Sequence, residues 1–325
     1  MTARRQGFVR MRVLVVTNMY PTRERPEFGR FVHDQVEDVR GRGIDVEVLA
    51  FDGTVDWRRY FRTALQLRSR LERGRFDLIH AHYGLTGAVA VTQRRLPVIT
   101  TFHGSDYDGP TWQRTVSRVV ARLSTPIVVS SRGRQLLGRP AAAVIPAGVD
   151  TDLLEPRNRT EARRQLGWDT SAPYALLPSS RGVRLKRADL FDAAVSLARR
   201  AVPELRSASL EHLTRAEVAC VMNAVDVTIL TSDSEGSPVA VRESLACLTP
   251  VVAVPVGDVV DVLRGLPGCA VVPRDPQAIA GAIVAALGVG RPPELRERAL
   301  QTSRSRIAAE VTAIYENVLM RRQSG

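Results

Sequence analysis

The sequence predicts an α/β protein made of two domains, each with a parallel β-sheet between layers of helices. Its length of 325 residues exceeds the usual size of a single hydrophobic core. Short apolar runs alternate with amphipathic stretches along most of the chain, which is typical of parallel sheets buried on both faces. The composition, with 44% hydrophobic and 25% charged residues, is that of an ordinary globular protein.

The first domain, residues 1–155, is expected to alternate strands and helices. Strands are expected at the apolar runs 12–17, 46–51, 78–81, 98–102, 126–129 and 143–146. Helices are expected at 28–41, 57–73, 85–94, 113–123 and 131–137. The polar stretch 155–159 is the expected connection to the second domain.

The second domain, residues 156–302, is expected to be a shortened version of the same arrangement. Strands are expected at 174–177, 226–231, 250–254 and 269–272, and helices at 187–201, 214–224, 238–247 and 257–264. The segment 202–211 is too polar for a central strand, which is why the domain is expected to be short. A last helix within 303–325 carries apolar residues at helical spacing and is expected to pack back on the first domain.

One block of the second domain carries two glutamates, Glu235 and Glu243, eight positions apart across a turn-to-helix junction. Ser237 is a good N-cap and Pro238 suits the first helical position, so a helix is expected to begin there, directly after the strand. This order directs free N–H groups and the positive helix end at an anion. Hydroxyl groups on either side of a diphosphate could bind the two carboxylates, as in a nucleotide sugar. Alternatively, the two are a helix cap and a solvated surface residue.

The chain contains 46 lysines and arginines, and only one of them, Lys186, is a lysine. It follows the apolar run 175–177, five positions after Arg181. An ammonium and a guanidinium do not substitute freely for each other at a phosphate, so the position of the single lysine favours a phosphate contact. The alternative is a stray codon in an arginine-biased genome.

The block 234–246 resembles the E-x7-E motif of the retaining glycosyltransferases of family 4, in the E-G-S-P form of a branch that includes teichuronic-acid glycosyltransferases. The resemblance covers nearly the whole chain and implies the GT-B fold, two Rossmann-like doubly wound domains that face a cleft. It implies that Glu235 contacts the donor sugar and Glu243 the nucleotide ribose. Arg181 and Lys186 match the pair of cations that clamp the diphosphate.

The same resemblance implies a phosphate contact from the backbone of Gly236, Ser237 and Pro238. No metal and no cofactor is expected, because fixed positive charge would neutralise the departing diphosphate.

Three motifs of the first half match the family in the same order. Residues 77–82 resemble its D-x-x-H-x-H segment, residues 101–106 its H-G-x-D segment, and residues 144–150 its I-P-N-G-V-D segment, with Ala147 in place of Asn. All three lie at carboxyl ends of predicted strands, where open α/β sheets bind ligands. The resemblance places His103 against the donor sugar and Gly29 in a loop over the donor phosphate. Either residue could instead be purely structural.

The formal net charge of +12 calls for an anionic partner. No recognised nucleic-acid motif is present, so an anionic membrane surface is the favoured partner. The segment 57–75 has aromatic and aliphatic residues on one predicted helical face and arginines elsewhere; it could bind such a surface or pack on its own sheet. No apolar run is long enough to span a bilayer or to form a signal-peptide core, so a cytoplasmic protein, peripheral on the inner face of the membrane, is expected.

The expected function is therefore that of a retaining glycosyltransferase with a UDP- or GDP-type donor and a lipid-linked or cell-envelope glycan acceptor. Two alternatives stay open. A nucleotide-sugar 2-epimerase or hydrolase of the same architecture would use the donor without an acceptor. A degenerate, non-catalytic family member would act only as a partner of another protein.

Overall fold

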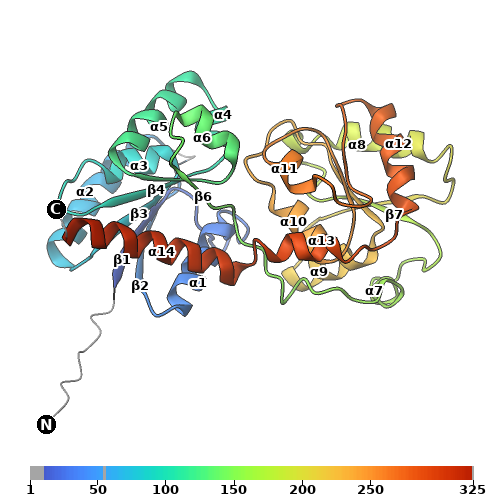
Figure 1. Cartoon of the computed structure of the whole chain (residues 1–325), viewed down its shortest axis with the longest axis horizontal. Helices are drawn as coiled ribbons and strands as arrows, with labels where there is room; N and C mark the ends of the chain where they lie inside the picture. Colours follow the sequence, from blue (N-terminus) through green and yellow to red (C-terminus); the bar gives the residue numbers. More distant parts are fainter. Residues whose placement is uncertain (1–10, 54–55, 324–325) are drawn as a thin grey trace, which may run out of the picture. The chain divides into compact units, whose positions relative to one another are not determined.

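The computed structural model describes residues 11–53 and 56–323. The chain divides into two compact units, one of Met1–Pro146 with Ile307–Gly325 and one of Ala147–Arg306. Each unit has one parallel sheet covered by helices, which confirms the predicted α/β class (Figure 1). Residues 147–155 and 303–306 group with the second unit, because the backbone of Val149 bonds to Thr302 and Arg304.

The sheet of the first unit has the strand order β2-β1-β3-β4-β5-β6. Its strands are β1 (Arg12–Thr17), β2 (Asp45–Ala50), β3 (Leu78–His82), β4 (Val98–Phe102), β5 (Thr125–Val128) and β6 (Ala143–Val144). Each of them lies within one residue of a predicted strand, except that β6 is shorter. Successive residues of β1 point to opposite faces and contribute to two different apolar clusters.

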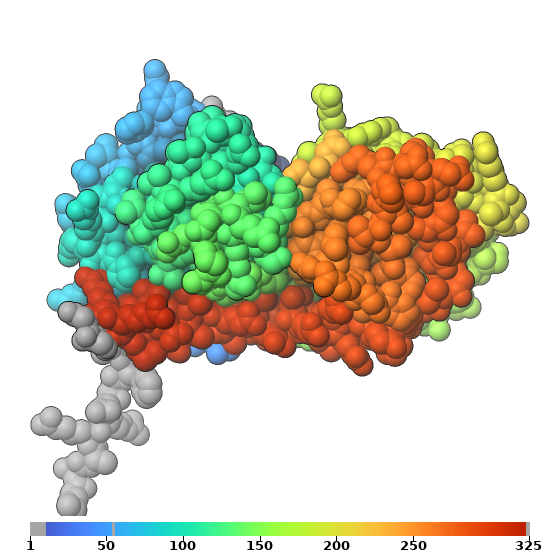
Figure 2. Space-filling model, turned by 45° about the horizontal axis from the view of Figure 1, so that its top comes forward, coloured from blue at the N-terminus to red at the C-terminus, as the bar shows by residue number. Residues whose placement is uncertain are grey.

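One face of this sheet is covered by α1 (Arg30–Gly41) and α14 (Arg304–Gln323). Ile307, Val311 and Tyr315 of α14 are buried in the same cluster as β1 and β3. In the space-filling view the red C-terminal segment lies directly against residues of this unit (Figure 2). The other face is covered by α2 (Arg58–Arg73), α3 (Gly84–Ala90), α5 (Thr111–Leu123) and α6 (Ser131–Leu137), with the short α4 (Ser105–Asp108) beside them.

Helix α2 has two apolar faces rather than the single face that the sequence predicts. Tyr60, Ala64, Leu67 and Leu71 pack on the sheet. The side chains at 57, 61 and 65, one turn apart, are each 66% exposed. The alternative in which the stripe packs on its own sheet therefore holds for part of the stripe only.

The sheet of the second unit has the order β11-β10-β9-β7-β8. Its strands are β7 (Tyr174–Leu177), β8 (Arg206–Ser209), β9 (Val227–Leu230), β10 (Val251–Ala253) and β11 (Ala270–Val271). The segment 202–211 thus contains a strand, β8, which the sequence reasoning did not place there. It lies at the edge of the sheet, where polar residues are tolerated, and its first two residues are exposed.

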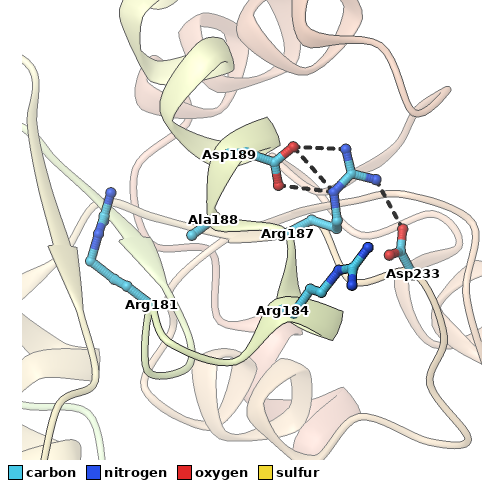
Figure 3. Close-up of a pocket in the computed structure, with 6 residues that line it drawn as sticks. All are labelled: Arg181, Arg184, Arg187, Ala188, Asp189 and Asp233. Carbon is cyan, nitrogen blue, oxygen red and sulfur yellow. Dashed lines mark hydrogen bonds and ion pairs between the residues drawn. The ribbon is translucent and has the colours of Figure 1, made fainter.

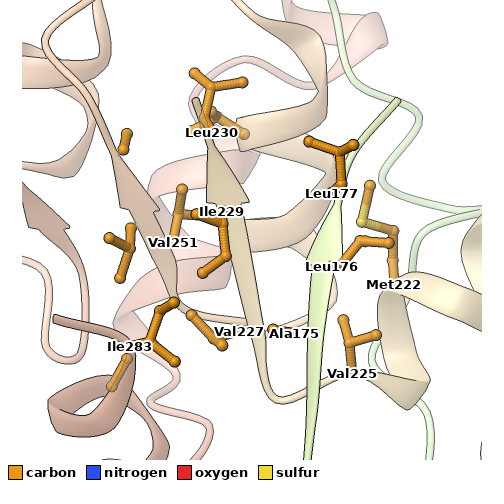
Figure 4. Close-up of a cluster of buried hydrophobic side chains, with 14 of the residues drawn as sticks. Ala175, Leu176, Leu177, Met222, Val225, Val227, Ile229, Leu230, Val251 and Ile283 are labelled. Carbon is orange, nitrogen blue, oxygen red and sulfur yellow. The ribbon is translucent and has the colours of Figure 1, made fainter. Parts of the chain in front are cut away.

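The helices of this unit are α7 (Arg159–Gln165), η1 (Arg184–Lys186), α8 (Ala188–Ala198), α9 (Arg215–Ala224), α10 (Val239–Ala246), α11 (Val259–Leu263), α12 (Pro276–Leu287) and α13 (Glu294–Leu300). Helices α7, α12 and α13 were not predicted. The start of α12 could have been predicted from the sequence, since Asp275 caps the helix and Pro276 is its first residue. Its core contact is visible in Figure 4, where Ile283 packs near Val227 and Val251.

Candidate active site

Two loops at the carboxyl ends of the paired strands β7 and β9 carry the predicted donor-binding residues. Lys186 ends the short helix η1, and Glu235 lies in the turn after β9. Their side chains form an ion pair, with 2.6 Å between Lys186 Nζ and Glu235 Oε1. Asp233 N also donates to Leu185 O over 2.9 Å, which ties the two loops together. The fold thus brings the single lysine and the first glutamate of the motif into contact.

Glu243 lies in the second turn of α10 and is only 6% exposed, so it is not a solvated surface residue. Its Oε1 accepts a hydrogen bond from Arg215 Nη2 over 2.5 Å. Arg215 is the first residue of α9 and was not predicted as a site residue. The capping box formed by Thr214 and Glu217 marks this helix start in the sequence, but no local pattern pairs Arg215 with a residue 28 positions away.

Helix α10 begins at Val239, one residue later than predicted, and Pro238 is its N-cap. Ser237 does not cap the helix, so that prediction was wrong. Its hydroxyl donates instead to Asp258 Oδ2 over 2.9 Å. The start of α10 therefore has no side-chain cap, and Gly236 lies in the turn immediately before it.

The guanidinium of Arg181 pairs with Asp192 of α8, not with a residue of the Lys186 loop. Both side chains are well exposed, at 40% and 52%. Exposed ion pairs of this kind contribute little free energy, roughly 0–1 kcal/mol, so an anionic ligand can compete for the guanidinium. The backbone of Arg181 is fixed more firmly, because its N–H donates to Glu211 Oε1 over 2.7 Å.

A pocket of about 440 Å³ lies beside η1 and the start of α8 (Figure 3). It is lined by Arg181, Arg184, Arg187, Ala188, Asp189 and Asp233. Arg187 has a left-handed backbone, with φ of 53°, and its guanidinium binds both carboxylates of the pocket. These hydrogen bonds raise the pKa of Arg187. Three guanidinium groups against two carboxylates make the pocket suitable for an anion.

Three histidines of the first unit, His80, His82 and His103, lie side by side toward the carboxyl ends of β3 and β4. His82 Nδ1 and His103 Nε2 lie 3.3 Å apart, and their rings are stacked with centroids 5.6 Å apart. His80 is 1% exposed, and both of its ring nitrogens have partners, Tyr315 Oη and Thr101 Oγ1. This satisfied, buried ring has a structural role.

Burial lowers the pKa of His103 well below its ordinary value and that of His82 to about 3, so both rings are neutral at pH 7. The backbone N–H of His103 donates to Asp106 Oδ2 over 2.6 Å. Burial raises the pKa of Asp106 to about 7, against two hydrogen bonds from the backbone that lower it. His103 therefore presents a neutral ring on a segment held by a buried carboxyl group.

Gly29 is the N-cap of α1 and has a φ of 71°. A Cβ at this position would lie 2.5 Å from the carbonyl carbon and oxygen of Met19. The glycine is thus required by the turn itself, which supports the structural alternative for this residue. Within residues 11–53 and 56–323, no group of three or more His, Cys, Asp or Glu residues could hold a metal ion.

Comparison with known proteins agrees with this arrangement. Residues 4–153 match the family model described as Glycosyltransferase Family 4. Residues 192–288 match the model described as Glycosyl transferases group 1. The chain belongs to the glycosyltransferases.

Solved structures show that this glycosyltransferase has the GT-B fold. Sucrose-phosphate synthase of Thermosynechococcus elongatus superposes with a TM-score of 0.80 at 18% identity, covering 96% of this chain and 100% of that one. Anabaena HepE in complex with UDP-glucose gives a TM-score of 0.67 at 16% identity, covering 94% and 100%.

Two sequence relatives are glycosyltransferases with different descriptions. A candidate teichuronic acid biosynthesis glycosyltransferase of Bacillus subtilis, TuaC, is 25% identical over 84% of this chain and 88% of its own length. The D-inositol 3-phosphate glycosyltransferase of Geodermatophilus obscurus is 30% identical over 69% of this chain and 63% of its own length. None of the helices in the described part of the glycosyltransferase is long and apolar enough to cross a membrane.

Proposed function

We propose that this glycosyltransferase retains the anomeric configuration and moves a sugar from a UDP- or GDP-type donor to a lipid-linked or cell-envelope glycan. The observation that carries the proposal is the contact between Lys186 and Glu235 beside the uncapped start of α10. One cation, one carboxylate and a helix N-terminus lie together at the carboxyl ends of adjacent parallel strands. This is where an open α/β sheet binds an anionic ligand.

In this proposal the diphosphate lies between Lys186 and the backbone of Gly236, Ser237 and Pro238. Negative charge grows on the diphosphate as the glycosidic bond breaks, so positive groups held in place stabilise the transition state more than the ground state. Arg181 adds a second cation by exchanging its exposed partner Asp192 for a phosphate oxygen. These cations take the place of a metal ion, and no cofactor takes part.

The two glutamates recognise the two ends of the donor. Glu235 accepts hydrogen bonds from hydroxyl groups of the sugar, and Lys186 holds its carboxylate in place before the donor arrives. Glu243 accepts a hydrogen bond from the ribose, and its ion pair with the partly exposed Arg215 fixes its position. We also assign to the neutral ring of His103 a contact with the donor sugar, and to the loop of Gly29 a contact with the donor phosphate.

The bond between the anomeric carbon and the β-phosphate oxygen breaks, and the acceptor oxygen attacks the same face of the sugar. The proton of the acceptor hydroxyl passes to the departing phosphate oxygen, so atoms and charges balance without a protein nucleophile. We accordingly assign no nucleophile. Retention follows because departure and attack take place on one face.

The identity of the donor is supported by Anabaena HepE, which was solved with UDP and with UDP-glucose. The relative named for teichuronic acid biosynthesis supports a cell-envelope acceptor. Several relatives are D-inositol 3-phosphate glycosyltransferases, so D-inositol 3-phosphate is the second acceptor to assay.

A polymer or lipid-linked acceptor fits a protein that binds the inner face of the membrane from the cytoplasm. The exposed face of α2, formed by Trp57, Phe61 and Leu65, supports this localisation. The same helix carries arginines at 58, 59, 62, 68, 70 and 73. Apolar side chains among arginines suit an anionic bilayer surface.

The decisive experiment is a thermal-shift panel of UDP, GDP, ADP and their sugars, followed by assays of donor turnover with and without acceptor. A transferase gains rate when the acceptor is added. Equal turnover without an acceptor would favour the hydrolase or 2-epimerase, and no stabilisation by any nucleotide would favour the non-catalytic alternative.

A further inference from the structure

The loop after β10 lies directly against the turn that carries Glu235. Gly257 in this loop has a φ of 55°, and a Cβ there would lie 2.8 Å from Gly236 O and 3.1 Å from Glu235 O. No other residue type fits, because it would meet the backbone of the turn. The conformation of the Glu235 turn therefore depends on a segment more than twenty positions further along the chain.

Asp258, the next residue, binds this turn and helix α10 at once. Its Oδ2 accepts a hydrogen bond from Ser237 Oγ over 2.9 Å and another from Arg242 Nη2. The side chains of Arg242 and Asp258 are only 5% and 9% exposed. One carboxylate oxygen thus joins the turn, the helix and the loop.

The Arg242–Asp258 ion pair is expected to contribute little to the free energy of unfolding. Desolvation of two charges commonly offsets their attraction, so a buried ion pair contributes little net stability. Here Arg242 Nη1 and Asp258 Oδ1 are also buried without a hydrogen-bond partner among the described residues. Unsatisfied buried polar atoms of this kind destabilise a fold. The benefit of the pair must therefore lie in the geometry that it imposes.

We infer that Asp258 and Arg242 are positioning residues that hold Glu235 in place for the donor sugar. The inference rests on the proposed function, in which Glu235 contacts that sugar. Arg242 and Glu243 are consecutive residues of α10, and their partners, Asp258 and Arg215, lie in two different elements. The helix is held at both positions, which keeps Glu235 and Glu243 at a fixed separation.

The test compares Asp258→Asn, Ser237→Ala and the double variant Asp258→Asn/Arg242→Met. The double variant removes both charges, so it leaves no unpaired buried charge and is expected to fold. Asp226→Asn is the matched control, because Asp226 pairs with the buried Arg163 elsewhere in the same unit. The measurements are the melting temperature, the affinities for UDP and UDP-glucose, and the rate of UDP release from UDP-glucose. GDP and GDP-mannose replace these probes if they stabilise the wild type more.

We expect Asp258→Asn to lower kcat by about tenfold or more, since small misplacements of reacting groups cost such factors. UDP affinity should change by less than about threefold, while the extra affinity for UDP-glucose over UDP is lost. The double variant should recover melting temperature but not kcat. Ser237→Ala should shift kcat in the same direction by a smaller factor, and Asp226→Asn should lower only the melting temperature.

The two hypotheses fail in different ways. If the wild type binds no nucleotide and turns over no nucleotide sugar, the proposed function is wrong and the positioning role falls with it. If the wild type is active and the double variant has both wild-type kcat and wild-type preference for UDP-glucose, the positioning role is wrong and the proposed function stands. If Asp258→Asn lowers the melting temperature, the UDP affinity and the UDP-glucose affinity together, the Arg242–Asp258 pair has a structural role only.

Discussion

Lys186 Nζ lies 2.6 Å from Glu235 Oε1, across 49 positions of sequence. The Lys186 side chain is 28% exposed and that of Glu235 14%, so the pair can be reached by a ligand but is partly shielded from solvent. Each group limits the freedom of the other before the donor binds. A diphosphate that approaches Lys186 must share this ammonium with Glu235, which couples phosphate binding to the orientation of the sugar-binding carboxylate.

The single lysine allows a chemical test of this contact. An amine-directed reagent can modify only Lys186 and the N-terminal amine, which serves as an internal reference. Saturating UDP should slow labelling of Lys186 and leave the reference unchanged, as measured by peptide mass spectrometry. Glu235→Gln should speed the labelling of Lys186, because the ammonium loses the carboxylate that it pairs with. Labelling that no nucleotide affects would contradict the clamp.

Lys186→Arg should lose most of the activity although the charge is kept. A planar guanidinium cannot occupy the place of a compact ammonium 2.6 Å from Glu235 Oε1. Lys186→Ala should lose more, in both donor affinity and kcat, by about tenfold to a thousandfold in kcat. Arg200→Lys, at an exposed position of the same unit that lies outside the pocket, is the matched control and should stay close to wild type. A fully active Lys186→Arg variant would mean that the position of the lysine is coincidence.

The two glutamates should give different defects. Glu235→Ala should abolish transfer with a modest loss of UDP affinity, because the residue contacts the sugar in our proposal. Glu243→Ala should weaken UDP binding and also lower the melting temperature, since it empties the space of a buried side chain and leaves the partly exposed Arg215 without its carboxylate. Adding Arg215→Met to Glu243→Ala should restore part of the melting temperature and none of the UDP affinity. Wild-type transfer in both single variants would show that the site lies elsewhere.

Local patterns in the sequence predicted the strands of the first unit because each is a short apolar run between turn residues. They also predicted the strand ends that carry Lys186 and Glu235. The same reasoning failed at β8, whose polar residues are typical of an edge and not of a central strand. It failed again at the start of α10, because a long-range bond to Asp258 takes the hydroxyl that would otherwise cap the helix.

Local sequence patterns could not predict which residues pair across long stretches of the chain. Arg215 pairs with Glu243 across 28 positions and Asp258 with Arg242 across 16, and neither spacing corresponds to a helical or strand period. Glutamate on a helix is usually exposed, so nothing in the composition of α10 indicates that Glu243 is buried. Such contacts follow from how the elements pack, and they are the ones that set the geometry of the candidate site.

Acid should destabilise the first unit through its buried histidines. The pKa of His82 is about 3 in the folded protein against 6.5 ordinarily, so between these values the unfolded chain binds one more proton. Stability is therefore lost as the pH falls from 6.5, by up to about 1.4 kcal/mol per pH unit. His82→Gln should make the free energy of unfolding depend less steeply on pH, by the equivalent of about one proton taken up on unfolding. Urea unfolding between pH 5 and 8 measures this dependence. An unchanged slope would show that His82 takes up its proton without unfolding.

Asp106 should change the dependence of stability on pH in the opposite direction to His82. Burial raises its pKa to about 7, so between pH 4 and 7 the folded protein binds a proton that the unfolded chain has lost. This group therefore contributes stability at low pH that disappears as the pH rises to 7. Asp106→Asn should remove that contribution and make the loss of stability in acid steeper than in the wild type. The same urea series checks it, and a shallower slope would contradict the assignment.

Binding to anionic vesicles should depend on the exposed face of α2. The double variant Trp57→Ser/Phe61→Ser removes two aromatic side chains that are each 66% exposed, so folding should be preserved. Co-sedimentation with vesicles containing phosphatidylglycerol should fall by about tenfold or more for this variant, and wild-type binding should weaken as salt rises. Val260→Ser/Leu300→Ser, at two exposed apolar positions of the second unit, is the matched control and should bind as the wild type does. Equal binding to neutral vesicles, or equal loss in both double variants, would remove the membrane surface from the proposal while leaving the enzymatic assignment intact.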